Sequence, residues 1–131
     1  MILAVDASAL VAIAFREPEG LLFQAALSKA ESAFMAPANV LEAGLAIVVR
    51  QALLDIGGYV DWLSELGVVE WPVAGASALE AYLRFGKGIH RASLNFGDCF
   101  AYALAKQLDA PLLYKGKDFD FTDVRPALQP M

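Results

Sequence analysis

The chain has 131 residues, a hydrophobic content of 58% and a formal net charge of −5. This length predicts one domain, residues 1–131, that is large enough to bury a core. The acidic balance argues against a protein that coats nucleic acid through a broad basic surface, and it favours a basic protein partner.

Compartment signals in the sequence are few. The single cysteine, Cys99, excludes an internal disulfide and fits a reducing cytoplasm. The apolar N-terminal segment 1–15 lacks a basic leader and is interrupted by Asp6, which argues against a signal peptide. No run of about 18 apolar residues is free of charge, so we expect no membrane helix. These features predict a cytoplasmic protein with no membrane partner.

Short apolar runs alternate with longer helical patterns along the chain, and this alternation predicts an α/β sandwich with a parallel sheet. The predicted elements, in chain order, are a strand at 2–5, helices at 8–15 and 18–30, a strand at 33–35, helices at 40–54 and 59–66, a strand at 68–71, a helix at 76–85, a loop at 86–93, a helix at 96–108, a strand at 112–114, a loop at 116–122 and an edge strand at Val124.

Four acidic residues, Asp6, Glu42, Asp98 and Asp118, each lie near a predicted strand end or helix start. In an open parallel sheet these positions share one edge, where ligands bind. Clustered carboxylates repel one another unless a cation lies between them, and such oxygen ligands suit Mg²⁺ or Mn²⁺. A carboxylate-lined metal site is one arrangement that enzymes use to cut phosphodiester bonds.

Two of these acids also have a simple structural explanation. Asn39 with Glu42, and Asn95 with Asp98, have the spacing of a capping box at the start of a helix. An acid in the first helical turn also favours the helix dipole. Both acids have apolar neighbours, however, and a buried carboxylate is costly unless it is paired or bound to a metal.

The remaining two acids have alternatives as well. Asp6 fits a turn or helix cap, and Ser8 could cap the helix, orient Asp6 or hold a water on a metal. A solvated acidic loop would explain Asp118. The nearby strand end favours a site instead, with Asp123 either supporting the ligands from behind or binding the metal through water, and with Thr122 fixing the loop through its hydroxyl.

Several segments carry a resemblance to a known family. They are VDASAL at 5–10, RFGKGIH at 84–90, LNFGDCFAYALAK at 94–106 and PLLYKGKDF at 111–119, followed by Thr122-Asp123. Together, and in this order, they resemble the PIN-domain ribonucleases, and most closely the VapC-type toxins of bacterial type II toxin–antitoxin pairs. Tyr114 is a small departure, since related chains often carry Phe at this position.

The resemblance implies a three-layer α/β/α sandwich with a central, mainly parallel sheet of four to five strands. It also implies RNA cleavage that depends on Mg²⁺ or Mn²⁺, with Asp6, Glu42, Asp98 and Asp118 as the catalytic and metal-binding quartet. Ser8 matches the serine of the family, and Asn95 matches its asparagine, more plausibly as a helix cap than as a ligand.

The resemblance further implies a homodimer and a basic, VapB-like antitoxin that blocks the site in a heterotetramer or larger complex. We expect basic side chains at the rim to hold the RNA backbone, and the candidates are Arg84, Lys87, Arg91 and Lys115. Two other classes stay open at this point. One is a metal-dependent phosphatase or a receiver-like domain, and the other is a non-catalytic interaction module on the same fold.

Overall fold

A parallel sheet of four strands forms the centre of the protein, in a computed structural model that describes residues 1–128. The strands are β1 (Ile2–Val5), β2 (Ser32–Met35), β3 (Val68–Glu70) and β4 (Leu112–Leu113), in the spatial order β3-β2-β1-β4. Every strand pairs in parallel with its neighbour, so all the strands end at the same edge.

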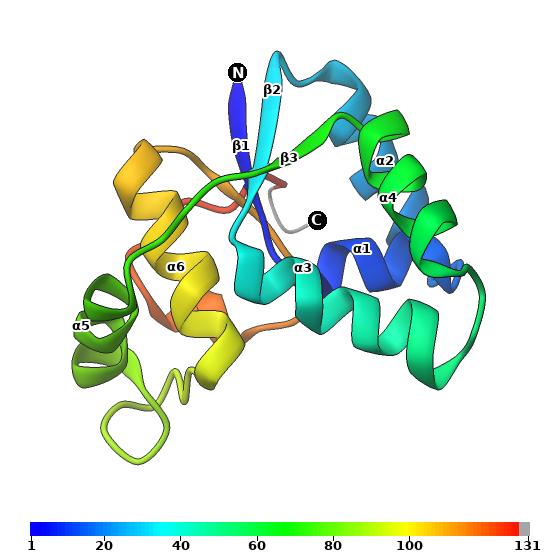
Figure 1. Cartoon of the computed structure of the whole chain (residues 1–131). Coiled ribbons are helices and arrows are strands. Elements are labelled where there is room, and N and C mark those ends of the chain that lie inside the picture. The colour runs from blue at the N-terminus through cyan, green and yellow to red at the C-terminus, as the bar shows by residue number, and fades with distance from the viewer. Residues whose placement is uncertain (129–131) are drawn as a thin grey trace.

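Helices cover both faces of this sheet, with α5 and α6 on one side and α1 to α4 on the other (Figure 1). This confirms the predicted three-layer sandwich. The helices are α1 (Ala7–Ala14), α2 (Gly20–Lys29), α3 (Pro37–Gly44), its π-helical continuation η1 (Leu45–Arg50), α4 (Ile56–Glu65), α5 (Gly75–Phe85), α6 (Phe96–Leu108) and the short 3₁₀ helix η2 (Asp118–Phe121).

The central strand β1 shows why an uninterrupted apolar run is needed here. Leu3 and Val5 point into the core beneath α1 to α4, whereas Ala4 belongs to the core beneath α5 and α6. All three are completely buried. Side chains alternate between the faces of a strand, so a strand covered on both faces has no position for a polar residue.

The start of α3 differs from the prediction. The helix begins at Pro37 and not at Val40, because a proline is favoured in the first helical turn and pushes the residue before it into extended backbone. Ala36 is therefore the N-terminal cap, and the predicted capping box of Asn39 and Glu42 is wrong. Asn39 instead lies inside the helix, where it is fully buried.

The neighbouring helix α4 also starts earlier than predicted. The prediction placed its start at Tyr59, whereas Gly57 and Gly58 already lie in the first turn of α4. Asp55 caps this turn by accepting a hydrogen bond from the Gly58 N–H at 2.7 Å. A cap of this kind contributes about 1 kcal/mol, which offsets part of the cost of glycine in a helix.

Two further differences concern element ends. Helix α2 begins at Gly20, two residues after Pro18. The expected edge strand at Val124 is reduced, within residues 1–128, to an isolated bridge between Leu112 and Pro126. The same part of the chain contains no helix that is long and apolar enough to cross a membrane.

Candidate active site

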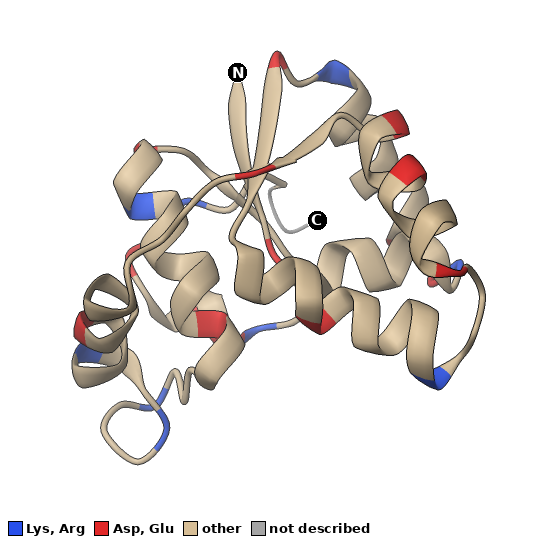
Figure 2. Ribbon diagram, viewed as in Figure 1, with Lys and Arg blue, Asp and Glu red and all other residues tan. Residues whose placement is uncertain are grey.

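The four predicted acids line a single cavity of about 490 Å³ at the edge where the strands end. Asp6 follows β1 directly, Glu42 lies in α3, Asp98 lies in the first turn of α6, and Asp118 begins η2. Figure 2 shows acidic segments on α3 and α6 close to the end of β1. The parallel sheet thus brings together residues that lie more than a hundred positions apart in the chain.

Asp6 is the most deeply buried of the four, with 4% of its surface exposed. It caps α1, and its Oδ2 accepts hydrogen bonds from the Ser8 N–H at 3.1 Å and the Ser8 hydroxyl at 2.5 Å. Its Oδ1 is buried without a hydrogen-bond partner among the described residues. Burial raises the pKa of Asp6 to about 7, and the charges of Asp98 and Glu42 add to this effect.

Ser8 connects two separate parts of the site. Its hydroxyl donates to Asp6 and accepts a hydrogen bond from the Lys115 N–H at 2.9 Å. The turn after β1 is therefore tied to the loop after β4. Three roles were predicted for Ser8: capping the helix, orienting Asp6, or holding a water on a metal. Asp6 itself caps α1, so these contacts support the second role, the orientation of Asp6.

Asp98 is both a helix cap and a member of the cavity. Asn95 accepts from the Asp98 N–H at 2.9 Å, and Asp98 Oδ2 accepts from the Asn95 N–H at 3.1 Å, which confirms the predicted capping box. Burial raises the pKa of Asp98 to about 6, and the charges of Asp118 and Glu42 add to this. The capping box therefore fixes the carboxylate and leaves its second oxygen to the cavity.

Glu42 is held by contacts that the sequence analysis missed. Asn39 Nδ2 donates to Glu42 Oε1 at 3.2 Å and to the Gly97 carbonyl at 2.9 Å, which joins α3 to α6. A Cβ atom at position 97 would lie 2.6 Å from both carboxylate oxygens of Glu42. The sequence did contain a signal for this contact. Glycine within a helix is less favourable than alanine by about 1 kcal/mol, so a glycine in the first turn of α6 indicates that another group lies too close for a side chain.

The chemistry of this donor set fits a divalent cation. The four side chains offer only carboxylate oxygens, the ligands that Mg²⁺ and Mn²⁺ prefer, and one buried oxygen of Asp6 lacks a partner. Within residues 1–128, no three His, Cys, Asp or Glu side chains lie close enough together to bind one metal ion as they stand. Mutual repulsion of carboxylates favours such a separation until a cation compensates their charge.

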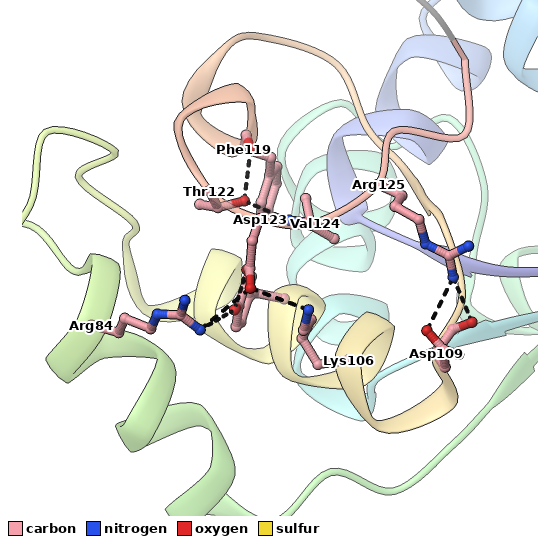
Figure 3. A network of polar contacts seen from close by, with 9 residues as sticks. Arg84, Lys106, Asp109, Phe119, Thr122, Asp123, Val124 and Arg125 are labelled. Carbon is pink, nitrogen blue, oxygen red and sulfur yellow. Dashed lines mark hydrogen bonds and ion pairs between the residues drawn. The ribbon is translucent and has the colours of Figure 1, made fainter.

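The structure gives Asp123 a different set of partners, outside the cavity. Its Oδ1 accepts from the Tyr102 hydroxyl at 2.5 Å, and its Oδ2 pairs with Lys106 at 3.2 Å and with Arg84 at 3.4 Å (Figure 3). These contacts anchor the segment after η2 to α5 and α6. Asp123 therefore supports the neighbouring loop rather than lining the cavity.

Thr122 completes this anchor, as the sequence suggested. Its hydroxyl donates to the Phe119 carbonyl at 2.7 Å and accepts from the Val124 N–H at 3.2 Å. Phe119 is buried and lines the cavity next to Asp118. The polar network thus fixes the backbone of the loop that carries the fourth acid.

Of the four basic residues expected at the rim, Lys115 lines the cavity, where it pairs with Glu17 at 2.8 Å. The other three, Arg84, Lys87 and Arg91, lie outside the cavity lining. Their contacts with RNA remain predictions. A further cation that the sequence analysis did not single out, Arg50, lines the cavity as well.

We expect the metal-free protein to lose stability as the pH rises from about 4 to 7. The carboxyl of Asp6 titrates near pH 4 in the unfolded chain but at about 7 in the folded protein. Below pH 4 both states are protonated. Between these values only the unfolded state releases its proton, so the free energy of unfolding falls by about 4 kcal/mol from Asp6 alone.

Thermal unfolding in EDTA across this pH range measures the effect. Asp6→Asn removes the titrating group, so its melting temperature should depend less on pH than that of the wild type. Millimolar Mg²⁺ or Mn²⁺ at pH 7 should stabilise the wild type more than the variant. A wild-type melting temperature that responds neither to pH nor to these ions would contradict the site.

Comparisons with known proteins place the chain in a defined group. Residues 3–124 match the PIN domain family. A ribonuclease VapC of Mycolicibacterium smegmatis is 44% identical, over 93% of this chain and 97% of that protein. Ribonuclease VapC30 of Mycobacterium tuberculosis is 42% identical, over 98% of this chain and 100% of that protein.

A solved structure supports the fold. The crystal structure of Mycobacterium tuberculosis VapC20, described as a sarcin-ricin loop cleaving toxin, matches with a TM-score of 0.69 and covers 95% of this chain and 99% of its own. At 16% sequence identity, this likeness shows the shared fold alone.

Proposed function

This chain belongs to the PIN-domain family and, within it, to the VapC ribonucleases, and we propose that it is the toxin of a type II toxin–antitoxin pair. It would cleave RNA phosphodiester bonds with Mg²⁺ or Mn²⁺ as cofactor. The observation that carries the proposal is the single cavity lined by Asp6, Glu42, Asp98 and Asp118. A module that only binds partners has no need to keep four repelling carboxylates in one cavity.

Asp6, Asp98 and Asp118 would hold the cation, with Glu42 binding directly or through water. A divalent ion in such a site lowers the pKa of water and stabilises negative charge on phosphate oxygens. The protein contributes fixed positions for the ligands. Ser8 holds Asp6, and the capping box holds Asp98, so these two carboxylates are oriented before substrate binds.

The remaining residues of the cavity would act on the substrate. A carboxylate that is not consumed as a ligand, for which Glu42 is the candidate, would orient the attacking water and accept its proton. Lys115 would bind a phosphate oxygen at the rim. Sequence-specific RNA cleavage usually targets single-stranded loops, because their bases are accessible. The open cavity would accept such a loop.

A phosphatase is less well supported. A phosphatase of the haloacid dehalogenase type would need a second aspartate where Ser8 stands, and a receiver domain would need its acceptor aspartate after β2, the strand next to the central β1. That strand is followed by Ala36 and Pro37. Neither arrangement is present.

The experiment that tests the proposal is cleavage of a labelled, structured RNA by the purified protein. We expect cleavage with Mg²⁺ or Mn²⁺ and none in excess EDTA, with recovery when the ion is restored. Cleavage that is unchanged in EDTA would contradict the metal-dependent mechanism. Release of phosphate from small phosphoesters, with the RNA left intact, would support the phosphatase instead.

One apolar face of the protein favours a homodimer. Leu41 and Val49 project from α3 and η1 with 64% and 66% of their surfaces exposed, and Phe96 at the start of α6 is 77% exposed. Leu41, Leu45 and Phe96 line a shared groove beside Glu42. A two-fold interface at this face would bury these side chains on both subunits.

A second apolar region would suit the antitoxin. A groove of about 720 Å³ runs between α1, η1 and the region of α4, and Phe15 lines both this groove and the acidic cavity. A peptide lying in the groove could therefore reach the acids. The best complement to clustered carboxylates is an arginine, whose guanidinium binds two oxygens at once. We expect such a side chain, inserted among the acids, to inhibit the enzyme.

Light scattering measures these assemblies. The toxin alone should have the mass of a dimer at tens of micromolar, and the complex with its antitoxin should have the mass of a heterotetramer or larger. Leu41→Glu should shift the toxin towards monomer, because it places two charges in the proposed interface, while the exposed Leu21→Glu on α2 serves as the control. A monomeric wild type at this concentration would reject the dimer.

A further inference from the structure

Arg50 lines the acidic cavity although it lies eight residues beyond Glu42. In a regular α-helix each residue turns by about 100°, so a residue eight positions on would lie about 80° away around the axis. The segment Leu45–Arg50 is instead a π-helix. Its wider turn advances by a smaller angle per residue, which returns Arg50 to the side of the helix that carries Glu42.

The contacts of the helix support this account. The Gln51 N–H donates to the Ala46 carbonyl at 3.0 Å, five residues earlier. Glu42, Ala46 and Arg50, spaced four residues apart, all line the same cavity. Turns of the π-helical kind are rare in proteins, and those that do occur are frequently found at functional sites. The π-helix therefore has a specific consequence here, which is the orientation of one basic side chain.

The charge of Arg50 is available for a ligand. Across residues 1–128, Arg50 forms no ion pair or hydrogen bond through its side chain, whereas Lys115, the other cation of the cavity, pairs with Glu17 and Glu19. The protein carries a net charge of −5, so its overall field does not attract RNA. Binding of an anionic chain next to four acids thus depends on local cations.

We propose that Arg50 binds a phosphate of the RNA that flanks the cleaved one, an inference that rests on the proposed ribonuclease function. Eight residues of regular α-helix would span about 12 Å along the axis, and the wider π-helical turn shortens this, so the backbone of Arg50 lies on the order of 10 Å from that of Glu42. This separation is larger than the distance between successive phosphates of an RNA strand, so the phosphate that Arg50 meets is a neighbour of the cleaved one. Figure 2 shows this basic segment at the end of the long helix that α3 begins, beyond the acidic segment.

A contact with a flanking phosphate has a recognisable kinetic effect. It is made equally in the ground state and the transition state, so its loss raises KM and leaves kcat nearly unchanged. Arg50→Gln should raise KM by about tenfold, the scale of one hydrogen-bonded charge. Arg50→Lys should keep most of the affinity, because it keeps the charge.

Salt dependence separates a phosphate contact from a structural role. Loss of one contact with single-stranded nucleic acid reduces the slope of log affinity against log salt by about 0.7. The matched control is Lys29→Gln, which removes one exposed positive charge from the end of α2, away from the cavity lining. It should leave both KM and the salt slope unchanged.

The decisive experiment combines two measurements. Cleavage kinetics are compared for the wild type, Arg50→Gln, Arg50→Lys and Lys29→Gln, and binding of a labelled single-stranded RNA is measured over a range of salt in an Asp98→Asn background. A reduced salt slope with Arg50→Gln, and not with Lys29→Gln, supports the proposal. Equal slopes for these two variants overturn it, even if the wild type cleaves RNA normally.

Failure of the proposed ribonuclease function and failure of the Arg50 contact give different results. If Arg50→Gln reduces the salt slope but neither the wild type nor any variant cleaves RNA, the proposed function fails and the phosphate contact stands. If Arg50→Gln lowers kcat and leaves KM unchanged, the side chain acts on the reacting phosphate, and its assignment to a flanking one is overturned. If the Asp98→Asn protein with Arg50 intact binds no RNA, the contact is overturned as well.

Discussion

Asp98→Asn should reduce RNA cleavage by at least about a hundredfold in a protein that remains folded. Asparagine keeps an oxygen that accepts from the Asn95 N–H, so the cap of α6 survives. It removes the negative charge that a cation needs. Because Asp98 is partly buried among like charges, the variant should also melt at a higher temperature than the wild type when no metal is present.

A matched control for this variant is Asp120→Asn. Asp120 is exposed, lies outside the cavity lining and accepts a hydrogen bond from Tyr114, which asparagine can also accept. Its cleavage rate should stay within about twofold of the wild type, since surface substitutions of this kind have small effects. Equal activity of the Asp98 variant and the wild type would exclude the proposed catalytic role.

Gly97→Ala, which adds a single methyl group, should reduce RNA cleavage by about a hundredfold. This is the loss of rate expected when a catalytic group is displaced by about 1 Å. The new Cβ would lie 2.6 Å from both carboxylate oxygens of Glu42, which must move away. The fold should tolerate this change, because the displaced atoms end a flexible side chain. Alanine also favours the helix by up to about 1 kcal/mol.

The control is Gly75→Ala, at the first residue of α5. A Cβ there would meet no atom within 4 Å. Activity and melting temperature of both variants are measured together. A Gly97→Ala enzyme as active as the Gly75→Ala enzyme would show that the position of Glu42 is not critical. A large fall in its melting temperature would instead mean that α3 and α6 have been pushed apart.

The sequence predicted most accurately the features that depend on close neighbours. The start of α6 and its capping box follow from Asn95 and Asp98, which lie three residues apart. Strand β1 follows from an apolar run that ends at Asp6. The helix α3 was predicted less well, because two local signals competed. Pro37 set the start of the helix, and the apparent capping box at Asn39 did not form.

The order of the elements, the parallel sheet and the four acids at its edge could be predicted from the sequence, because apolar periodicity and turn residues act over a few positions. The surroundings of those acids, in contrast, depend on contacts between distant parts of the chain. Asn39 reaches Gly97 across 58 positions, Asp123 pairs with groups on α5 and α6, and a π-helix turns Arg50 towards the cavity. These contacts depend on how closely helices pack and how each is rotated about its axis, and no local pattern encodes that geometry.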